Sequence, residues 1–376
     1  MRKIQMVDLQ TQYQLIKPKV DAGMQEVLSS AQFINGPAVK HFQADLEAYL
    51  GVKHVIPCAN GTDALQVAMM GLGLMPGDEV ITANFTFAAT VEVIALLGLT
   101  PVLVDVLHDT FNIDPDAIEK AITPKTKAIV PVHLFGQVSD MDRIMGIAHE
   151  HNLFVIEDNA QGIGATHTDA AGNKVKTGGI GHVGSTSFFP SKNLGCYGDG
   201  GAIFTNDDDL AHTIRGVVNH GMYKRYHHDV VGVNSRLDSL QAVVLNEKLK
   251  FLDFYNERRK WAAIRYSQLL QNHPKIETPV TSGDCDSHVY HQYTLKIVGA
   301  DRDALVQYLQ QNDIPCGVYY PIPLHLQKAY VDMRYKEEDF KITNQLIDEV
   351  ISLPMHSELD EEQVQFICKM ILAFLD

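Results

Sequence analysis

The chain has 376 residues, of which 45% are hydrophobic and 20% are charged, a composition that excludes disordered, low-complexity and collagen-like proteins. This length exceeds what one hydrophobic core usually supports, so we expect a large domain and a smaller one. The 31 basic and 46 acidic side chains give a formal net charge of -15, which disfavours binding to nucleic acid and to anionic membrane surfaces.

The cysteines and the N-terminal residues predict the compartment. The five cysteines lie far apart and form no C-x-x-C or zinc-knuckle spacing, so they predict reduced thiols without a disulfide framework or a zinc site. The first residues lack the apolar core of a signal peptide, and the apolar stretch 93–104 is too short and too interrupted to span a bilayer. We therefore expect a soluble, cytoplasmic protein.

Between about residues 50 and 205, short β-branched segments alternate with amphipathic segments of helical length. This alternation is the sequence form of βαβ units and predicts an α/β layer structure around a mainly parallel sheet. The predicted strands are 55–58, 79–82, 102–105, 128–132 and 153–158, and helices are predicted at 63–70 and 140–151.

From residue 238 a helical pattern continues through Trp261, and the composition then changes to mixed strands and helices. We expect a domain boundary near residue 250, with a large domain and N-terminal arm at 1–250 and a smaller α+β domain at 251–376. In the smaller domain we expect a strand, a helix and an ordered proline-rich loop, at 293–297, 301–312 and 319–323 respectively.

Two polar residues in buried surroundings carry the chemistry. Asp158 ends a predicted buried strand, where open α/β sheets bind ligands and where a charge is otherwise costly, so it should have a cationic partner. Lys192 lies in a loop rich in aromatic residues and glycine, where partial burial lowers an ammonium pKa and exposes a nucleophilic amine, as a Schiff-base lysine requires. Taken singly, Asp158 also suits a helix cap and Lys192 a solvated surface.

The ordered set of motifs favours a cofactor site. E-D-x-A-Q at 157–161, S-F-x-x-x-K-x-L-G at 187–195 and G-D-G-G-A at 198–202 together resemble the DegT/StrS family of pyridoxal-phosphate-dependent nucleotide-sugar aminotransferases. The resemblance extends over nearly the whole chain, and its specificity lies in the order and spacing of motifs that are weak alone. It implies the aspartate-aminotransferase fold (fold type I), with a mainly parallel sheet in the large domain and a smaller α+β C-terminal domain.

The resemblance also implies the role of each matching residue. Lys192 would bind pyridoxal phosphate covalently and, once released, move a proton between substrate and cofactor. Asp158 would hold the protonated pyridine nitrogen, and Gln161 would lie beside the ring hydroxyl. Phe87 would stack on the pyridine face, although a phenylalanine considered alone is more often a core residue.

The cofactor phosphate is expected where Gly61 and Thr62 open a helix, because a helix N-terminus presents free N–H groups and the positive end of the dipole. Taken alone, this pair is a plain turn. Ser187 would donate its hydroxyl to the same phosphate. In the family, the loop that corresponds to Asn234 and Arg236 reaches into the neighbouring subunit's site, so Asn234 would contact the cofactor and Arg236 the substrate in trans. An obligate homodimer with composite sites follows.

The histidines form no H-x-x-x-H pattern with a downstream carboxylate, so we expect no metal site. The basic segment 224–226, with Arg225 at its centre, suits either a rim that binds a nucleotide diphosphate or a solvated loop.

The segments 225–228 and 232–242 resemble family members that aminate C3 of the sugar, most closely those acting on a UDP-2-acetamido-2-deoxy-3-keto-hexuronic acid. Arg236 has the fork geometry to bind the C6 carboxylate of such a sugar or the carboxylate of L-glutamate as amino donor. Tyr319 and Tyr320 are the further substrate-contact candidates. Members of that subgroup often have histidine where this chain has Tyr319, which is a departure from the pattern.

Two alternatives stay open. One is an aminotransferase for a dTDP-linked 3-keto or 4-keto 6-deoxyhexose, and the other is a pyridoxal-phosphate-binding sensor without turnover. The presence of Lys192, Asp158 and Gln161 together argues against the sensor, and lysine instead of histidine argues against the related dehydratases. The expected partners are a keto nucleotide sugar, L-glutamate and a second copy of the chain.

Overall fold

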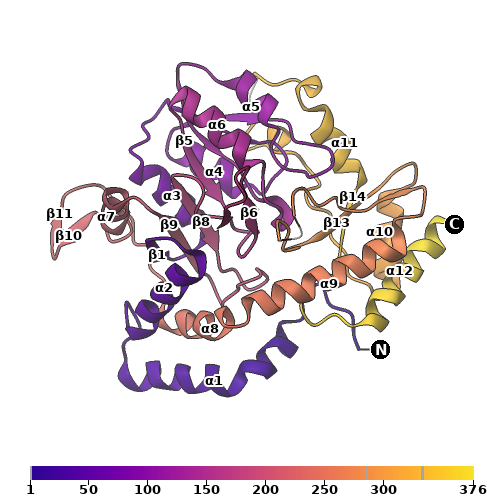
Figure 1. Ribbon diagram of the computed structural model, residues 1–376, viewed down its shortest axis with the longest axis horizontal. Coiled ribbons are helices and arrows are strands. Elements are labelled where there is room, and N and C mark those ends of the chain that lie inside the picture. The colour runs from indigo at the N-terminus through magenta and orange to yellow at the C-terminus, as the bar shows by residue number, and fades with distance from the viewer. Residues whose placement is uncertain (1, 285, 332–333) are drawn as a thin grey trace.

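The computed structural model describes residues 2–284, 286–331 and 334–376. Within these residues, seven strands form one sheet in the order β1-β9-β8-β5-β4-β2-β3. Figure 1 labels β1, β9, β8 and β5 of this sheet. The strands are β1 (His54–Cys58), β2 (Glu79–Ala83), β3 (Thr100–Val104), β4 (Thr126–Val130), β5 (Phe154–Asp158), β8 (Val183–Ser187) and β9 (Gly201–Thr205). Strand β9 is antiparallel to both of its neighbours, and the other pairs are parallel. The predicted mainly parallel α/β sheet is confirmed.

Helices cover both faces of this sheet, because successive strand residues point to opposite faces. Val80 packs on the face covered by α3, α4 and α7, whereas the next residue, Ile81, packs on the face covered by α5 and α6. Both faces are therefore dry, and the sequence of these strands is almost continuously hydrophobic. These helices are α3 (Gly61–Gly71), α4 (Ala89–Leu96), α5 (Pro115–Ala121), α6 (Met141–His151) and α7 (Asp208–Val217).

The long helix expected from residue 238 onward is wrong in one respect, because it is two helices. Helix α8 (Ser239–Leu249) packs on α1 (Leu9–Ser30) and α2 (Pro37–Leu50), whereas α9 (Leu252–Leu270) packs on α12 (Glu361–Leu375). The backbone leaves the helical region at Phe251, with φ −114° and ψ 4°. The two halves pack against different neighbours, and the break at Phe251 lets the axis change direction between them (Figure 1).

The C-terminal part has its own antiparallel sheet in the order β12-β13-β14. It comprises β12 (Ile276–Glu277), β13 (Tyr293–Ile297) and β14 (Val350–Leu353), with α10 (Arg302–Gln311) and α11 (Lys341–Glu349). The strand and helix expected there are confirmed. Ile4 is buried in the core of this part, and the Arg2 guanidinium donates to the Asp360 carboxylate at 3.1 Å, so the first residues lie beside α12. The boundary near residue 250 stays a prediction.

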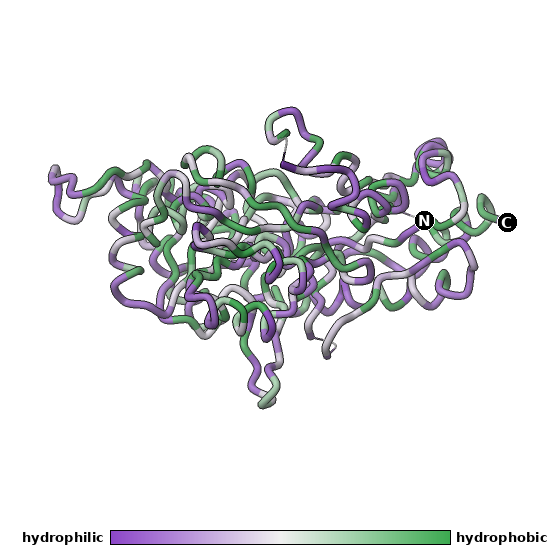
Figure 2. The backbone as a smooth tube through the Cα atoms, turned by 90° about the horizontal axis from the view of Figure 1, so that it is seen from above, coloured by the Kyte–Doolittle hydropathy of each residue, from purple (hydrophilic) through white to green (hydrophobic). Residues whose placement is uncertain are grey.

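The remaining elements are short. Within the described ranges, two hairpins lie outside the main sheet: β6 (Thr166–Thr168) with β7 (Lys174–Lys176), and β10 (Met222–Lys224) with β11 (His227–His228). These ranges also contain three 3-10 turns, at Leu134–Gly136, Leu324–Leu326 and Glu337–Phe340. The β10–β11 hairpin projects from the end of the molecule opposite the two chain termini (Figures 1 and 2). No helix in the described part of the chain is long and apolar enough to cross a membrane.

Candidate active site

A cavity of about 690 Å³ lies beyond the carboxyl ends of β1, β2, β5 and β8. Because these strands are parallel, the segments that follow them meet at one edge of the sheet, where α/β proteins bind ligands. Nine of the residues expected in the site from the sequence line this cavity: Gly61, Thr62, Phe87, Asp158, Gln161, Ser187, Lys192, Tyr319 and Tyr320.

One end of the cavity is suited to an anion. The Asn60 side chain caps α3 by accepting from the Asp63 amide at 2.8 Å, and the amides of Gly61 and Thr62 have no partner among the described residues. A Cβ atom at Gly61 would lie 2.6 Å from the Ser187 Cβ, so only glycine permits this close approach. The free amides and the Ser187 hydroxyl thus form a narrow cradle of hydrogen-bond donors.

The two consecutive acids at the end of β5 have different surroundings. Glu157 is fully buried and accepts hydrogen bonds from His133 Nε2 at 2.9 Å and from the amides of Gly178, Ile180 and Gly181. These bonds, above all the one from His133, hold the pKa of this carboxyl below its usual value against the effect of burial. Glu157 is therefore a structural group that anchors the loop before β8.

Asp158 faces the cavity and is 6% exposed. Its Oδ2 accepts from Thr90 Oγ1 at 2.8 Å, and its Oδ1 accepts from the Ala160 amide at 3.2 Å. Two donors orient the carboxylate, and no cation lies within ion-pair distance of it among the described residues. A buried carboxylate in this state is ready to bind a positively charged ligand atom.

Lys192 lies in the loop that follows β8 and is half-buried. Burial lowers the pKa of its ammonium to about 8, although the negative charge of Asp158 opposes this shift. Its Nζ has no hydrogen-bond or ion-pair partner among the described residues. A sizeable fraction of this amine is therefore neutral and nucleophilic near physiological pH.

Gln161, Phe87 and Tyr320 complete the walls. Gln161 Oε1 accepts from the Phe135 amide at 2.7 Å, and its Nε2 donates to the Tyr320 hydroxyl at 3.3 Å. Burial raises the pKa of Tyr320, so the phenol stays protonated. The Phe87 side chain is 58% exposed, with its ring centroid 6.3 Å from that of Tyr320. Phe87 is thus no core residue and offers an aromatic face to the cavity.

Three expected site residues lie outside this cavity. Arg225 is exposed on the β10–β11 hairpin, where its guanidinium donates to the Tyr226 hydroxyl at 3.2 Å. Asn234 is exposed, and the half-buried Arg236 has no ion pair or hydrogen bond among the described residues. Their loop is attached near the start of α3, since Ser235 Oγ accepts from the Ala59 amide at 3.0 Å.

Three residues at the site, Thr86, Thr90 and His291, were not predicted as site residues from the sequence. Thr86 lines the cavity with a buried Oγ1 atom that has no hydrogen-bond partner in the described part of the chain, and His291 also lines it. Thr90 orients Asp158 from α4. The position of Thr86 just beyond β2 was a usable signal, whereas His291 comes from a segment about 100 residues after Lys192 and carries no local signal.

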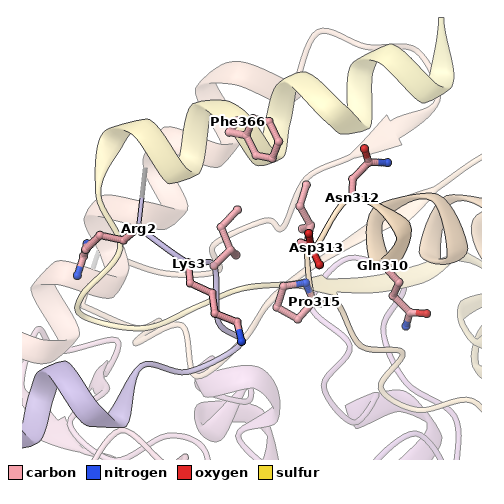
Figure 3. A pocket seen from close by; sticks show the side chains of 9 residues that line it. Arg2, Lys3, Gln310, Asn312, Asp313, Pro315 and Phe366 are labelled. Atoms are coloured by element: carbon pink, nitrogen blue, oxygen red, sulfur yellow. The ribbon is translucent and has the colours of Figure 1, made fainter.

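A second cavity, of about 680 Å³, lies between the first residues, the end of α10 and α12 (Figure 3). It is lined by Arg2, Lys3, Ile4, Gln310, Asn312, Asp313, Ile314, Pro315 and Phe366. None of the expected site residues lies there. In the part of the chain that the structure describes, no group of three or more metal-ligating side chains could hold a metal ion.

The first cavity suits pyridoxal phosphate by the chemistry of its donors. It combines an anion cradle that a Cβ at Gly61 would fill with three groups that find no partner among the described residues: the Asp158 carboxylate, which has no cation, the Lys192 amine and the Thr86 hydroxyl. Such groups at the edge of a mainly parallel sheet define a fold type I pyridoxal-phosphate enzyme. The sequence profile of the DegT/DnrJ/EryC1/StrS aminotransferase family matches residues 14–372, and the chain belongs to this family.

Similar proteins span nearly the whole chain. A pleiotropic regulatory protein of Geobacillus stearothermophilus is 46% identical, over 99% of this chain and 98% of its own length. The UDP-2-acetamido-2-deoxy-3-oxo-D-glucuronate aminotransferase of Pseudomonas aeruginosa is also 46% identical, over 97% and 98%. A dTDP-3-amino-3,4,6-trideoxy-alpha-D-glucose transaminase of Streptomyces venezuelae is 38% identical, over 96% and 93%.

Solved structures of similar proteins have the same fold as this chain over nearly its whole length. DesV of S. venezuelae, in complex with a ketimine intermediate, superimposes with a TM-score of 0.95 at 37% identity, over 100% of this chain and 99% of that chain. NtdA of Bacillus subtilis, with bound cofactor PMP, gives a TM-score of 0.89 at 34% identity, over 98% and 83%. The chain is a pyridoxal-phosphate-dependent nucleotide-sugar transaminase, which confirms the fold, the cofactor and the enzyme class expected from the sequence.

Proposed function

We propose that the protein transfers an amino group from L-glutamate to C3 of a UDP-2-acetamido-2-deoxy-3-keto-hexuronic acid. The observation that carries the transfer chemistry is the partly neutral Lys192 amine in the same cavity as the Asp158 carboxylate, where neither group has an ion-pair partner among the described residues. The 46% identity to the P. aeruginosa aminotransferase supports the choice of sugar.

Each wall of the cavity has a task in this proposal. The amides of Gly61 and Thr62 and the hydroxyl of Ser187 hold the cofactor phosphate. Asp158, oriented by Thr90 and Ala160, holds the proton on the pyridine nitrogen. When bound, pyridoxal phosphate supplies the electron sink that stabilises negative charge on the substrate carbon.

Lys192 moves the proton in both half-reactions. Its Nζ would hold the cofactor covalently at rest and, once free, would take a proton from the α-carbon of glutamate as a general base and deliver it to the cofactor. A pKa of about 8 keeps both protonation states populated near neutral pH, so in the second half-reaction the same atom would carry a proton from the cofactor to C3 of the sugar. Phe87 and Tyr320 line the same cavity with their ring centroids 6.3 Å apart, and their aromatic faces would cover the bound cofactor.

The substrates carry more negative charge than this chain neutralises by itself. Among the described residues that line the cavity there is no arginine, and Lys192 is the only lysine. A cofactor phosphate, a nucleotide diphosphate and carboxylates require cations and hydrogen-bond donors. We therefore assign Asn234, Arg236 and Arg225, which lie outside the cavity, to the site of a second subunit, which makes the homodimer part of the proposal.

A second candidate is amination of a dTDP-linked 6-deoxyhexose. One observation favours it: Tyr319 stands where uronate-specific members often have histidine. The S. venezuelae transaminase, which is 38% identical, shows that relatives named for such sugars also span this chain. The regulatory name of the G. stearothermophilus relative is the one observation that points to a sensor without turnover. The complete set of Lys192, Asp158 and Gln161 favours turnover.

Comparison of kcat/KM for two sugars tests the substrate. If arginine binds the C6 carboxylate, the UDP-linked 3-keto uronic acid is preferred over its 6-deoxy analogue by about 100-fold, because the analogue leaves a desolvated charge without a partner. Equal kcat/KM values, or a higher value for the 6-deoxy sugar, would contradict the uronate proposal and favour amination of a 6-deoxyhexose. Absence of turnover with every keto sugar, in a protein that binds the cofactor, would favour the sensor.

A further inference from the structure

His291 is a cavity residue to which the proposed function gives no task. It lies just before β13, is 8% exposed, and lines the same cavity as Lys192. Its Nδ1 lies 3.3 Å from Asn193 Oδ1, in the residue next to Lys192. The chain thus places an imidazole beside the amine-bearing loop.

The hydrogen bonds around Asn193 fix the tautomer of this imidazole. Asn193 Nδ2 donates to Asn256 Oδ1 at 2.8 Å and to the Val289 carbonyl at 3.0 Å, so its amide has one orientation. Asn193 Oδ1 can therefore only accept, and His291 Nδ1 must carry the proton. The lone pair of the neutral ring is consequently on Nε2.

The surroundings keep His291 neutral. Burial, together with the positive charges of Lys192 and Arg259, lowers its pKa well below 6.5. Nε2 has no hydrogen-bond partner among the described residues, and neither has Lys192 Nζ. His291 Nε2, an acceptor that lacks a donor, and Lys192 Nζ, a donor that lacks an acceptor, therefore line the same cavity.

We propose that His291 is a positioning residue for Lys192: rotation of the lysine side chain within the shared cavity lets its free amine donate a hydrogen bond to His291 Nε2, a bond that the described side-chain positions do not make. The inference rests on the proposed role of Lys192 and deepens it. The bond fixes where Nζ lies after it has left the cofactor, and it stabilises the ammonium form that must keep its proton until delivery. His291 acts through Lys192 and does not itself exchange protons with the substrate.

Two substitutions separate this role from a packing role. His291→Asn keeps a group at the position of Nδ1 that can bond to Asn193 and removes the acceptor at Nε2. His291→Gln does the reverse, because its longer side chain places an acceptor near the position of Nε2. The measurement is the rate at which the cofactor-free protein captures pyridoxal phosphate as a function of pH, with kcat and KM for glutamate as the second readout.

The inference predicts that His291→Asn moves the pH midpoint of capture down by about one unit, because the ammonium loses a charge-assisted hydrogen bond. We also expect kcat to fall about tenfold with KM unchanged, while His291→Gln keeps values near those of the wild type. Wild-type behaviour of His291→Asn, or equal losses in both variants, would overturn the inference. A wild-type protein that captures no pyridoxal phosphate would instead overturn the proposed function.

A measurement on the unaltered protein remains decisive if a variant fails to fold. Nitrogen-15 NMR of the imidazole of His291 should show the neutral Nδ1–H tautomer at pH 7. A ring protonated on Nε2 can only donate there, and that result would contradict the inference.

Discussion

At the scale of single residues, the adjacent acids Glu157 and Asp158 at the end of β5 have different roles. Glu157 receives donors on both oxygens and belongs to the framework, whereas Asp158 receives two donors and leaves its charge without a cation. Because neighbouring strand residues point to opposite faces, the two acids have different surroundings: Glu157 meets His133 and the loop before β8, and Asp158 meets Thr90 and the cavity.

This division predicts the effect of Asp158→Asn. The variant should still bind pyridoxal phosphate through the phosphate cradle, but its activity should fall by about 100-fold or more, because a neutral amide cannot hold the proton on the pyridine nitrogen. Steady-state kinetics on cofactor-saturated protein measure this. Turnover like that of the wild type would remove Asp158 from its proposed role.

The depressed pKa of Lys192 predicts a pH dependence. Only the neutral amine attacks the cofactor aldehyde, so the rate of pyridoxal phosphate capture by cofactor-free protein should rise with pH up to about 8 and level off above it. Stopped-flow absorbance follows the reaction. A rate that continues to rise towards pH 10.5, the ordinary lysine value, would show that burial does not lower this pKa.

At the scale of elements, the N-terminus of α3 and the end of β8 meet because Gly61 has no side chain. Gly61→Ala should force the two segments apart and weaken pyridoxal phosphate binding by about 100-fold, roughly the worth of two charge-assisted hydrogen bonds. A spectrophotometric titration measures the affinity. The matched control is Gly146→Ala in α6, where a Cβ meets no atom within 4 Å; equal affinities in both variants would refute the cradle.

The strands and helices also show which features of the fold a local sequence pattern predicts and which it does not. The β-branched segments predicted five strands of the main sheet, because strands that are buried on both faces must be continuously apolar. The hydrophobic pattern did not predict the break between the helices at Phe251. Leu249 and Leu252 are both buried and lie three residues apart, as in a continuous helix. Tertiary packing, and not propensity, sets that boundary.

The same limit applies to the site. Asp158 and Lys192 follow strands whose ends must meet, so their proximity follows from the parallel order of the strands. Thr90 and His291 reach the cavity only through the packing of α4 and of the segment before β13. No spacing in the sequence records such contacts between distant segments, and these two residues could not be predicted.

At the scale of the whole molecule, the proposed composite site predicts complementation between inactive subunits. Lys192→Ala and Arg236→Ala should each be inactive alone, yet a mixture should recover part of the activity, because some mixed dimers contain one intact site. Activity after subunit exchange, verified with two different affinity tags, measures this. An inactive mixture despite exchange would place Arg236 in the site of its own subunit or outside any site.

The central claim is that Lys192 and Asp158 make this chain a pyridoxal-phosphate-dependent aminotransferase. The most direct test is the visible absorbance spectrum of the purified protein with pyridoxal phosphate, before and after L-glutamate is added. We expect a yellow protein whose visible band disappears with glutamate, returns with a keto sugar, and never forms in Lys192→Ala. A wild-type protein that develops no visible band with pyridoxal phosphate, or a band in Lys192→Ala that glutamate discharges equally, would contradict the claim.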